Sequence, residues 1–232
     1  MKRAALFSLA LLAVPRVSGR GGPAISRALE AHYRSVKTLQ AVFLERYTEG
    51  RQGIRVESGT VYFSRPGRMR WEYESPELKL FVVDGKNVWF YVPADHAASR
   101  EKLKESSDWR TPFALITGKA RLSRLCSKVE EVETRPAGTS ADGAHAANDT
   151  LRCLPREDSR SATGGPFREM LLEVNPAHQL VRVLIREPGD VETEFRFANW
   201  QENVPLPEAK FHFEPPPGVA IVGATTLTGE SH

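Results

Sequence analysis

The sequence has no long apolar run apart from one near its amino terminus. That run, residues 4–14, is shorter than the roughly 20 residues that a membrane-spanning helix needs. It follows a basic start and precedes small residues at 17–19, the pattern of a cleaved secretion signal. No cysteine comes directly after the run, which argues against a lipid anchor on the mature protein. We therefore predict a signal peptide over residues 1–19 and a single exported domain over residues 20–232.

An excess of charge of one sign is also lacking. The chain has 32 basic and 29 acidic residues, and removal of residues 1–19 takes away three basic residues and leaves 29 of each sign. Nucleic-acid-binding proteins typically carry an excess of basic residues, so the balanced charge argues against a nucleic acid as the main partner.

Motifs that carry chemistry are absent as well. The six histidines include no pair at metal-ligand spacing, and there is no Gly-x-Ser-x-Gly elbow, phosphate loop or dinucleotide fingerprint. Carboxylates are numerous, but they fall on the charged faces of expected strands. We therefore predict no enzymatic activity, no cofactor and no metal site.

Cysteine is scarce, with only Cys126 and Cys153 in the chain. Two cysteines in an exported protein are able to form a disulfide, which would close a loop of about 28 residues. Two free buried thiols are the alternative, and the sequence does not choose between them.

Alternation of apolar and charged residues is the dominant pattern present. In residues 68–74, Met69, Trp71 and Tyr73 fall on one side and charged residues on the other, as in a strand with one apolar face. Such strands form an antiparallel sheet with one wet side. We expect strands over residues 41–48, 54–63, 68–74, 78–83, 87–92, 167–174, 180–185, 191–198 and 210–213.

Helical material is limited. Residues 25–39 have the apolar spacing of an amphipathic helix. Residues 112–117 form a short apolar helix, with Thr111 at the N-cap and Gly118 at the C′ position. This is thin cover for a wide sheet. Either the sheet curls around an apolar cavity with the helices as a lid, or the β core is fully packed and binds no ligand.

Arg65 lies just before the alternating strand, at the bend Arg65-Pro66-Gly67. It has the parity of Met69 and Trp71, so a regular strand would point this arginine to the apolar side, where it must be hydrogen-bonded. If the bend changes the parity, Arg65 is a solvated arginine at the sheet edge. Both interpretations fit the pattern.

Five segments together carry a family resemblance. Gly59 to Trp71 combines a glycine, a strand, Arg-Pro and a tryptophan, and Val83 to Tyr91 combines an Asp-Gly-Lys hairpin with an aromatic run. Leu39 to Phe43, a Thr-Pro-Phe helix at Thr111 to Ile116, and a Phe-x-Phe, proline and glycine pattern at Phe211 to Val219 complete the set. The chain resembles the periplasmic outer-membrane lipoprotein carrier family, LolA, although residues 135–166 show no match.

The resemblance implies a mainly β fold, an eleven-stranded antiparallel incomplete barrel with a helical lid. It implies a monomeric carrier in the periplasm that takes acylated lipoproteins from an inner-membrane ABC-type releasing complex to an outer-membrane receptor lipoprotein. Arg65 would bond to lid backbone and lock the empty state, and carbonyls at the end of the 112–117 helix are suitable acceptors. Met69 stands where we would expect an aromatic residue at the mouth. The expected cavity lining is Met69, Trp71, Phe90, Phe113, Leu115 and Ile116.

Three alternatives stay open. The lining residues would also suit ordinary core packing. The same fold would suit a non-carrier protein that senses or binds envelope lipids or lipoproteins, although such proteins usually carry a further domain. An envelope lipid hydrolase is disfavoured by the missing nucleophile motif.

Overall fold

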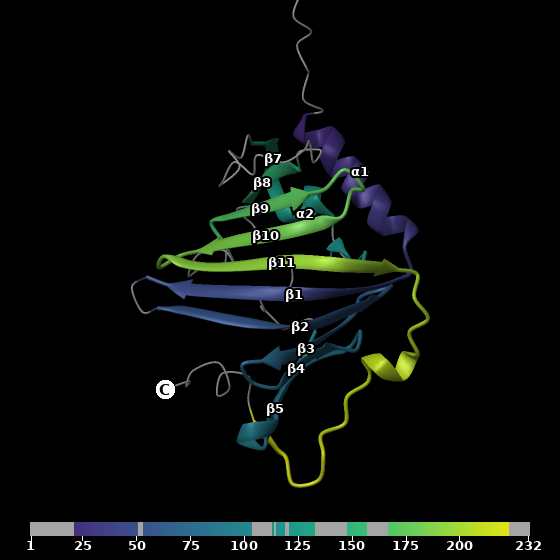
Figure 1. Cartoon of the computed structure of the whole chain (residues 1–232), viewed down its shortest axis with the longest axis vertical. Helices are drawn as coiled ribbons and strands as arrows, with labels where there is room; N and C mark the ends of the chain where they lie inside the picture. The colour runs from purple at the N-terminus through teal and green to yellow at the C-terminus, as the bar shows by residue number, and fades with distance from the viewer. Residues whose placement is uncertain are drawn as a thin grey trace, which may run out of the picture.

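The computed structural model describes residues 21–50, 53–103, 113, 115–118, 121–132, 148–156 and 167–222. In this part of the chain, twelve strands form one open sheet in the order β12-β6-β5-β4-β3-β2-β1-β11-β10-β9-β8-β7. Figure 1 shows the sheet curving from β7 at the top to β5 at the bottom, with the first helix along one side of its upper part. The predicted signal peptide lies outside the described residues.

The helices and strands of the described residues are as follows. The helices are α1 (Gly22–Ser35), η1 (Pro93–Asp95), α2 (Leu122–Leu125) and η4 (Glu208–Phe211). The strands are β1 (Thr38–Glu49), β2 (Ile54–Ser64), β3 (Arg68–Ser75), β4 (Lys79–Val83), β5 (Asn87–Val92), β6 (Ala97–Lys102), β7 (Cys126–Glu131), β8 (Asp149–Pro155), β9 (Glu169–Val174), β10 (Leu180–Glu187), β11 (Val191–Glu202) and β12 (Ala220–Val222).

The sheet confirms the mainly β prediction and the expected incomplete barrel, with a small difference in strand number. Twelve strands are present among the described residues instead of eleven, and the short β12 pairs with β6 in parallel while the other neighbours are antiparallel. The strand expected over 210–213 is wrong, because residues 208–211 form a 3-10 helix. The helix expected over 25–39 begins at Gly22 and ends at Ser35, and the extended Val36 leads into β1.

The inner face of the sheet holds the main core. Side chains on alternate positions of the strands point to this face and pack beneath α1, whose Ile25, Leu29 and Tyr33 are buried. Tyr33 Oη also accepts a hydrogen bond from the backbone nitrogen of Leu180 at 2.9 Å, which ties α1 to β10. The apolar stripe of α1 therefore covers one end of the curved sheet.

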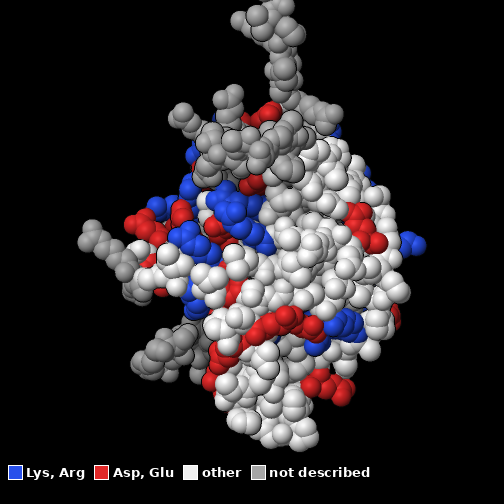
Figure 2. Space-filling model, in the orientation of Figure 1, with Lys and Arg blue, Asp and Glu red and all other residues white. Residues whose placement is uncertain are grey.

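The outer face carries cross-strand ion pairs. Glu169 on β9 accepts hydrogen bonds from Arg152 on β8 and Arg186 on β10. Burial alone would raise the pKa of Glu169, but the hydrogen bonds and charges of these two arginines outweigh it and hold the pKa below its ordinary value. Figure 2 likewise shows basic and acidic side chains next to one another on the molecular surface.

A second, smaller core lies on the outer face of β4 to β6. The carboxy-terminal segment leaves β11 and runs along the sheet to its lower end, as Figure 1 shows in yellow. There the ring of Phe213 lies 5.5 Å from that of Trp89 and 5.3 Å from that of Tyr91. Phe213 thus packs across the strands and does not pair within the sheet. The alternation of apolar residues over 210–213 reflects this packing, and this is why the pattern wrongly predicted a strand.

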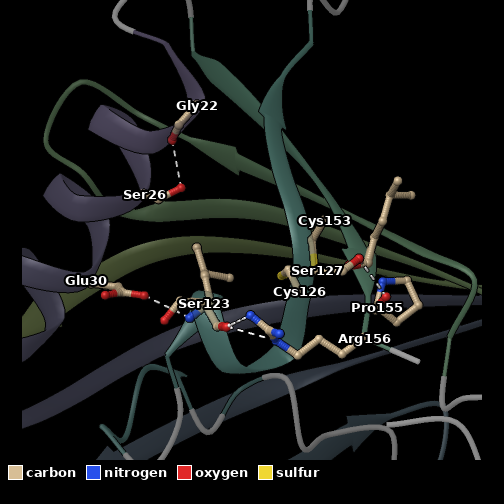
Figure 3. Close-up of a disulfide and its surroundings, with 11 residues drawn as sticks. Gly22, Ser26, Glu30, Ser123, Cys126, Ser127, Cys153, Pro155 and Arg156 are labelled. Carbon is tan, nitrogen blue, oxygen red and sulfur yellow. Dashed lines mark hydrogen bonds between the residues drawn. A yellow bond between two sulfur atoms is a disulfide. The ribbon is translucent and has the colours of Figure 1, made fainter. Parts of the chain in front are cut away.

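Cys126 and Cys153 form a disulfide between the edge strand β7 and its neighbour β8, which lie close to α1 (Figure 3). Close by, Glu30 of α1 accepts a hydrogen bond from the backbone nitrogen of Leu122 at 2.8 Å. The disulfide and this bond hold the sheet edge, α2 and α1 together. None of the helices in the described ranges has the length and apolarity needed to cross a membrane.

Candidate functional site

Trp71 of β3 is the centre of an aromatic cluster on the inner face. Its ring lies 4.9 Å from Phe43, 5.1 Å from Phe113 and 5.4 Å from Phe195, between ring centroids. The side chain is 0% exposed, and its Nε1 donor has no hydrogen-bond partner within the described part of the chain. An unpaired buried N–H costs free energy.

Residues 113 and 115–118, which we call the 113–118 segment, rest directly on this cluster. Phe113, Leu115 and Ile116 are buried, and the Phe113 ring lies 5.1 Å from that of Phe195. The segment is a tight turn, in which the nitrogen of Ile116 bonds to the Phe113 oxygen at 3.0 Å. Gly118 ends it with φ +74°, as the C′ assignment predicted, while Thr111 and Pro112 lie outside the described residues.

The bend before β3 holds this segment in place. The backbone nitrogen of Gly67 donates a hydrogen bond to the Thr117 oxygen at 3.2 Å. The guanidinium of Arg65 lies against Gly118, so closely that a Cβ at Gly118 would stand 1.9 Å from Nη2. The 65–67 bend and the 117–118 turn are therefore in direct contact.

The hydrogen-bond acceptor of Arg65 differs from the one expected. Its Nη1 donates to the carbonyl oxygen of Tyr33, in the last turn of α1, and not to the end of the 113–118 segment. The physical reason is the one used for the prediction, since the last four carbonyls of a helix lack partners within the helix. Burial, and then the neighbouring Arg34, lower the pKa of Arg65. Arg65 thereby links α1, the bend and the 113–118 segment.

The other predicted lining residues lie on the same face. Met69 is buried beside the cluster on β3, and Phe90 of β5 is partly buried against it. In the register of the sheet, Phe90 faces Phe81, which in turn faces Trp71. All six predicted residues thus lie on or against the inner face. In this conformation they pack against one another, so both the cavity-lining and the core-packing interpretations stay open.

The outer face has an open depression of about 850 Å³ near the tips of the β1–β2 and β10–β11 hairpins. Its lining includes Arg46, Arg168 and Arg186 together with Glu169 and Glu192. A lining of full charges does not suit acyl chains, because their burial requires apolar surface. The inner face is the better candidate for an apolar ligand.

Sequence reasoning missed one polar feature of the inner face. Glu45 on β1 and Glu57 on β2 are buried on the apolar side. Glu45 lies two residues after Phe43, and Glu57 lies two residues before Gly59. The period-2 pattern contained this signal, because Glu45 has the parity of Ala41 and Phe43.

Comparison with known proteins places the chain among relatives of similar length. Residues 34–142 match the family model described as "Outer membrane lipoprotein carrier protein LolA". A protein of Chromobacterium violaceum named outer-membrane lipoprotein carrier protein is 30% identical over 218 residues, covering 91% of this chain and 95% of its own. A protein of the same name from Xylella fastidiosa is 30% identical over 220 residues and 94% of each chain.

A solved structure shares the fold. The crystal structure of an uncharacterized conserved protein from Thermus thermophilus superposes with a TM-score of 0.51 at 16% identity, covering 86% of this chain and 96% of its own. At this identity the likeness concerns the fold alone. The sequence identity over nearly full-length relatives shows that the chain belongs to the outer-membrane lipoprotein carrier family, LolA.

Proposed function

We propose that the protein carries lipoproteins through the periplasm by holding their acyl chains against the inner face of the sheet. The cargo would come from an inner-membrane ABC-type releasing complex and pass to an outer-membrane receptor lipoprotein. Family membership supports the carrier role, and the names of the relatives supply the cargo class. The protein would act without a cofactor and as a monomer.

One observation supports the binding site above the others. Phe113, Leu115 and Ile116 belong to a short segment, yet they cover the centre of the aromatic cluster around Trp71. If this segment moves away, it exposes an apolar surface in the interior of the curved sheet. The side chains of the segment and the acyl chains of a cargo would then compete for the same surface.

This competition would lower the free energy of cargo binding to a value that still permits release. Burial of an acyl chain contributes about 0.8 kcal/mol per methylene, so about 15 methylenes contribute roughly 12 kcal/mol. Complete burial of several chains would make release too slow for a carrier. Closure of the segment over Trp71, fixed by Arg65 and Gly67, would offset part of that free energy and favour release.

The direct test is the native mass of the mature protein, purified from a bacterial periplasm without detergent. A stoichiometric adduct that proves to be a triacylated lipoprotein supports the carrier. A phospholipid or glycolipid adduct instead would indicate a different lipid traffic. Absence of any adduct, together with no uptake of an apolar fluorescent probe, would indicate a permanently packed core and refute the proposal.

A second test separates carriage from sensing. The chain, expressed in a strain depleted of its own carrier, is expected to restore growth and lipoprotein localisation. A protein that only senses or binds lipids would not restore either. A lipid-hydrolysis assay on the purified protein is expected to show no turnover.

A further inference from the structure

On β1 and β2 the inner face changes from apolar to charged. Along β1 the inward residues Ala41 and Phe43 are followed by Glu45, which is 5% exposed. On β2, Glu57 lies opposite Glu45 in the register and is 7% exposed. Two carboxylates therefore face each other across neighbouring strands, on the side that otherwise holds the core.

Each carboxylate has a partner from a neighbouring strand. Tyr73 Oη of β3 donates to Glu45 Oε2 at 2.7 Å, and Lys79 Nζ of β4 donates to Glu57 Oε1 at 2.6 Å. Arg55 Nε lies 3.7 Å from the same Glu57 oxygen. We call Glu45, Glu57, Tyr73 and Lys79 the acidic rung, since they come from four adjacent strands and lie at neighbouring positions of the register.

The acidic rung borders the aromatic cluster. The Tyr73 ring lies 5.0 Å from that of Phe43, which itself lies 4.9 Å from Trp71. Glu45 also faces Phe195 across the β1–β11 pair. A ligand whose chains lie on Trp71 would place its polar end within reach of these carboxylates.

Stability does not explain this arrangement. Like charges directly opposite on a sheet repel each other, and buried ion pairs are commonly no more stable than the apolar residues that could replace them. The remaining inward positions of β1 up to Phe43 are apolar. A functional role for the two carboxylates is the simpler explanation.

We propose that the acidic rung selects the head of the cargo, an inference that rests on the proposed carrier function. The acylated amino terminus of a lipoprotein offers amide N–H groups, which are able to donate hydrogen bonds to the carboxylate of Glu45. An anionic phospholipid has acyl chains of the same kind, but it offers a phosphate and no amide donor. That phosphate would add negative charge beside the carboxylate of Glu45 without offering it a donor, whereas Glu57 is ion-paired with Lys79 and Arg55, so the rung favours lipoproteins over anionic phospholipids.

The test is a competition assay on the full mature protein. A bound apolar fluorescent probe is displaced either by a synthetic triacylated lipopeptide or by phosphatidylglycerol, and the ratio of the two affinities is measured. In the Glu45→Gln/Glu57→Gln double variant, we expect the preference for lipopeptide to fall by about tenfold, mainly through tighter binding of phosphatidylglycerol.

Glu194→Gln is the matched control. Glu194 is also 7% exposed and ion-paired, but it lies on the outer face of β11, where it accepts a hydrogen bond from Arg182. Its loss is expected to leave the preference unchanged. If the double variant does not fold, the single Glu45→Gln variant tests the carboxylate that would bind the amide, with about a threefold expected change.

The outcomes are distinct. A preference that stays within about twofold of the parent in a folded variant overturns the role of the rung while the carrier function stands. An equal change in Glu194→Gln also overturns it, because the effect would then come from net charge. Failure of both lipids to displace the probe from the parent protein refutes the proposed function itself and the inference with it.

Discussion

Replacement of Arg65 by leucine removes a side chain that links the last turn of α1 to the 117–118 turn. Arg65 Nη1 donates to the Tyr33 oxygen, and its guanidinium lies against Gly118. A hydrogen bond from a charged group contributes about 1.5–3 kcal/mol, and partial exposure of this side chain reduces the range to about 1–2 kcal/mol. We infer that α1 leaves the bend together with the 113–118 segment on opening, so that this free energy stabilises only the closed, empty conformation.

The expected consequence is tighter binding and slower release. A loss of about 1–2 kcal/mol from the closed state raises the ratio of open to closed molecules about 5- to 30-fold. Apparent affinity for a ligand of the open state rises by the same factor for as long as the closed state predominates. Titration of Arg65→Leu with an apolar fluorescent probe measures this gain, and transfer of bound lipoprotein to the receptor lipoprotein measures the slower release.

Arg34→Leu is the control for the change in charge. Arg34 is exposed near Arg65, where its charge helps to lower the pKa of Arg65, and its side chain makes no hydrogen bond within the described residues. This variant is expected to match the parent in affinity and release. Parental affinity and release in Arg65→Leu would refute the lock, as would an equal response in Arg34→Leu.

Three further predictions concern other parts of the structure. Gly118→Ala places a Cβ 1.9 Å from the Arg65 guanidinium at φ +74°, so probe binding should tighten as in Arg65→Leu. The control Gly189→Ala has a similar φ of +85° but no atom within 4 Å of the added Cβ, so it should only lower the melting temperature. Loss of the Cys126–Cys153 disulfide, 27 residues apart in sequence, should cost about 3–4 kcal/mol in chemical unfolding, and an unchanged midpoint after reduction would contradict this. The pKa of Glu169 in the folded protein lies below its ordinary value of 4.5. The ionised Glu169 therefore stabilises the fold fully above pH 4.5, and this stabilisation is lost as the pH falls through the lower folded-state pKa. In urea unfolding between about pH 5 and pH 3, Glu169→Gln should therefore lose less stability than the parent.

The strands that sequence reasoning missed show where a local pattern is insufficient. In β6, Ala98 and Ser99 are buried although they are small and adjacent in sequence, so no alternation of large apolar residues announces the strand. Its existence depends on pairing with β5 and β12. A small residue is buried there because its neighbours cover it, and the sequence of β6 alone does not contain that information.

The sequence by itself determined which side chains share a face. Side chains alternate along a strand, so the parity of Met69, Trp71 and Tyr73 alone was enough to assign them to the inner face. The same parity marked Arg65 as a candidate for the inner side and contained the signal of Glu45. These conclusions depend only on residues close together in the chain, where backbone geometry is regular.

Only the tertiary structure decided which groups these side chains meet. Arg65 bonds to Tyr33, which is 32 residues away in sequence and belongs to a different element. Glu45 meets Tyr73 because β1, β2 and β3 lie side by side in one register. Such partners depend on the packing of a helix onto a sheet and on the pairing of strands, and the free energy of both depends on the whole chain.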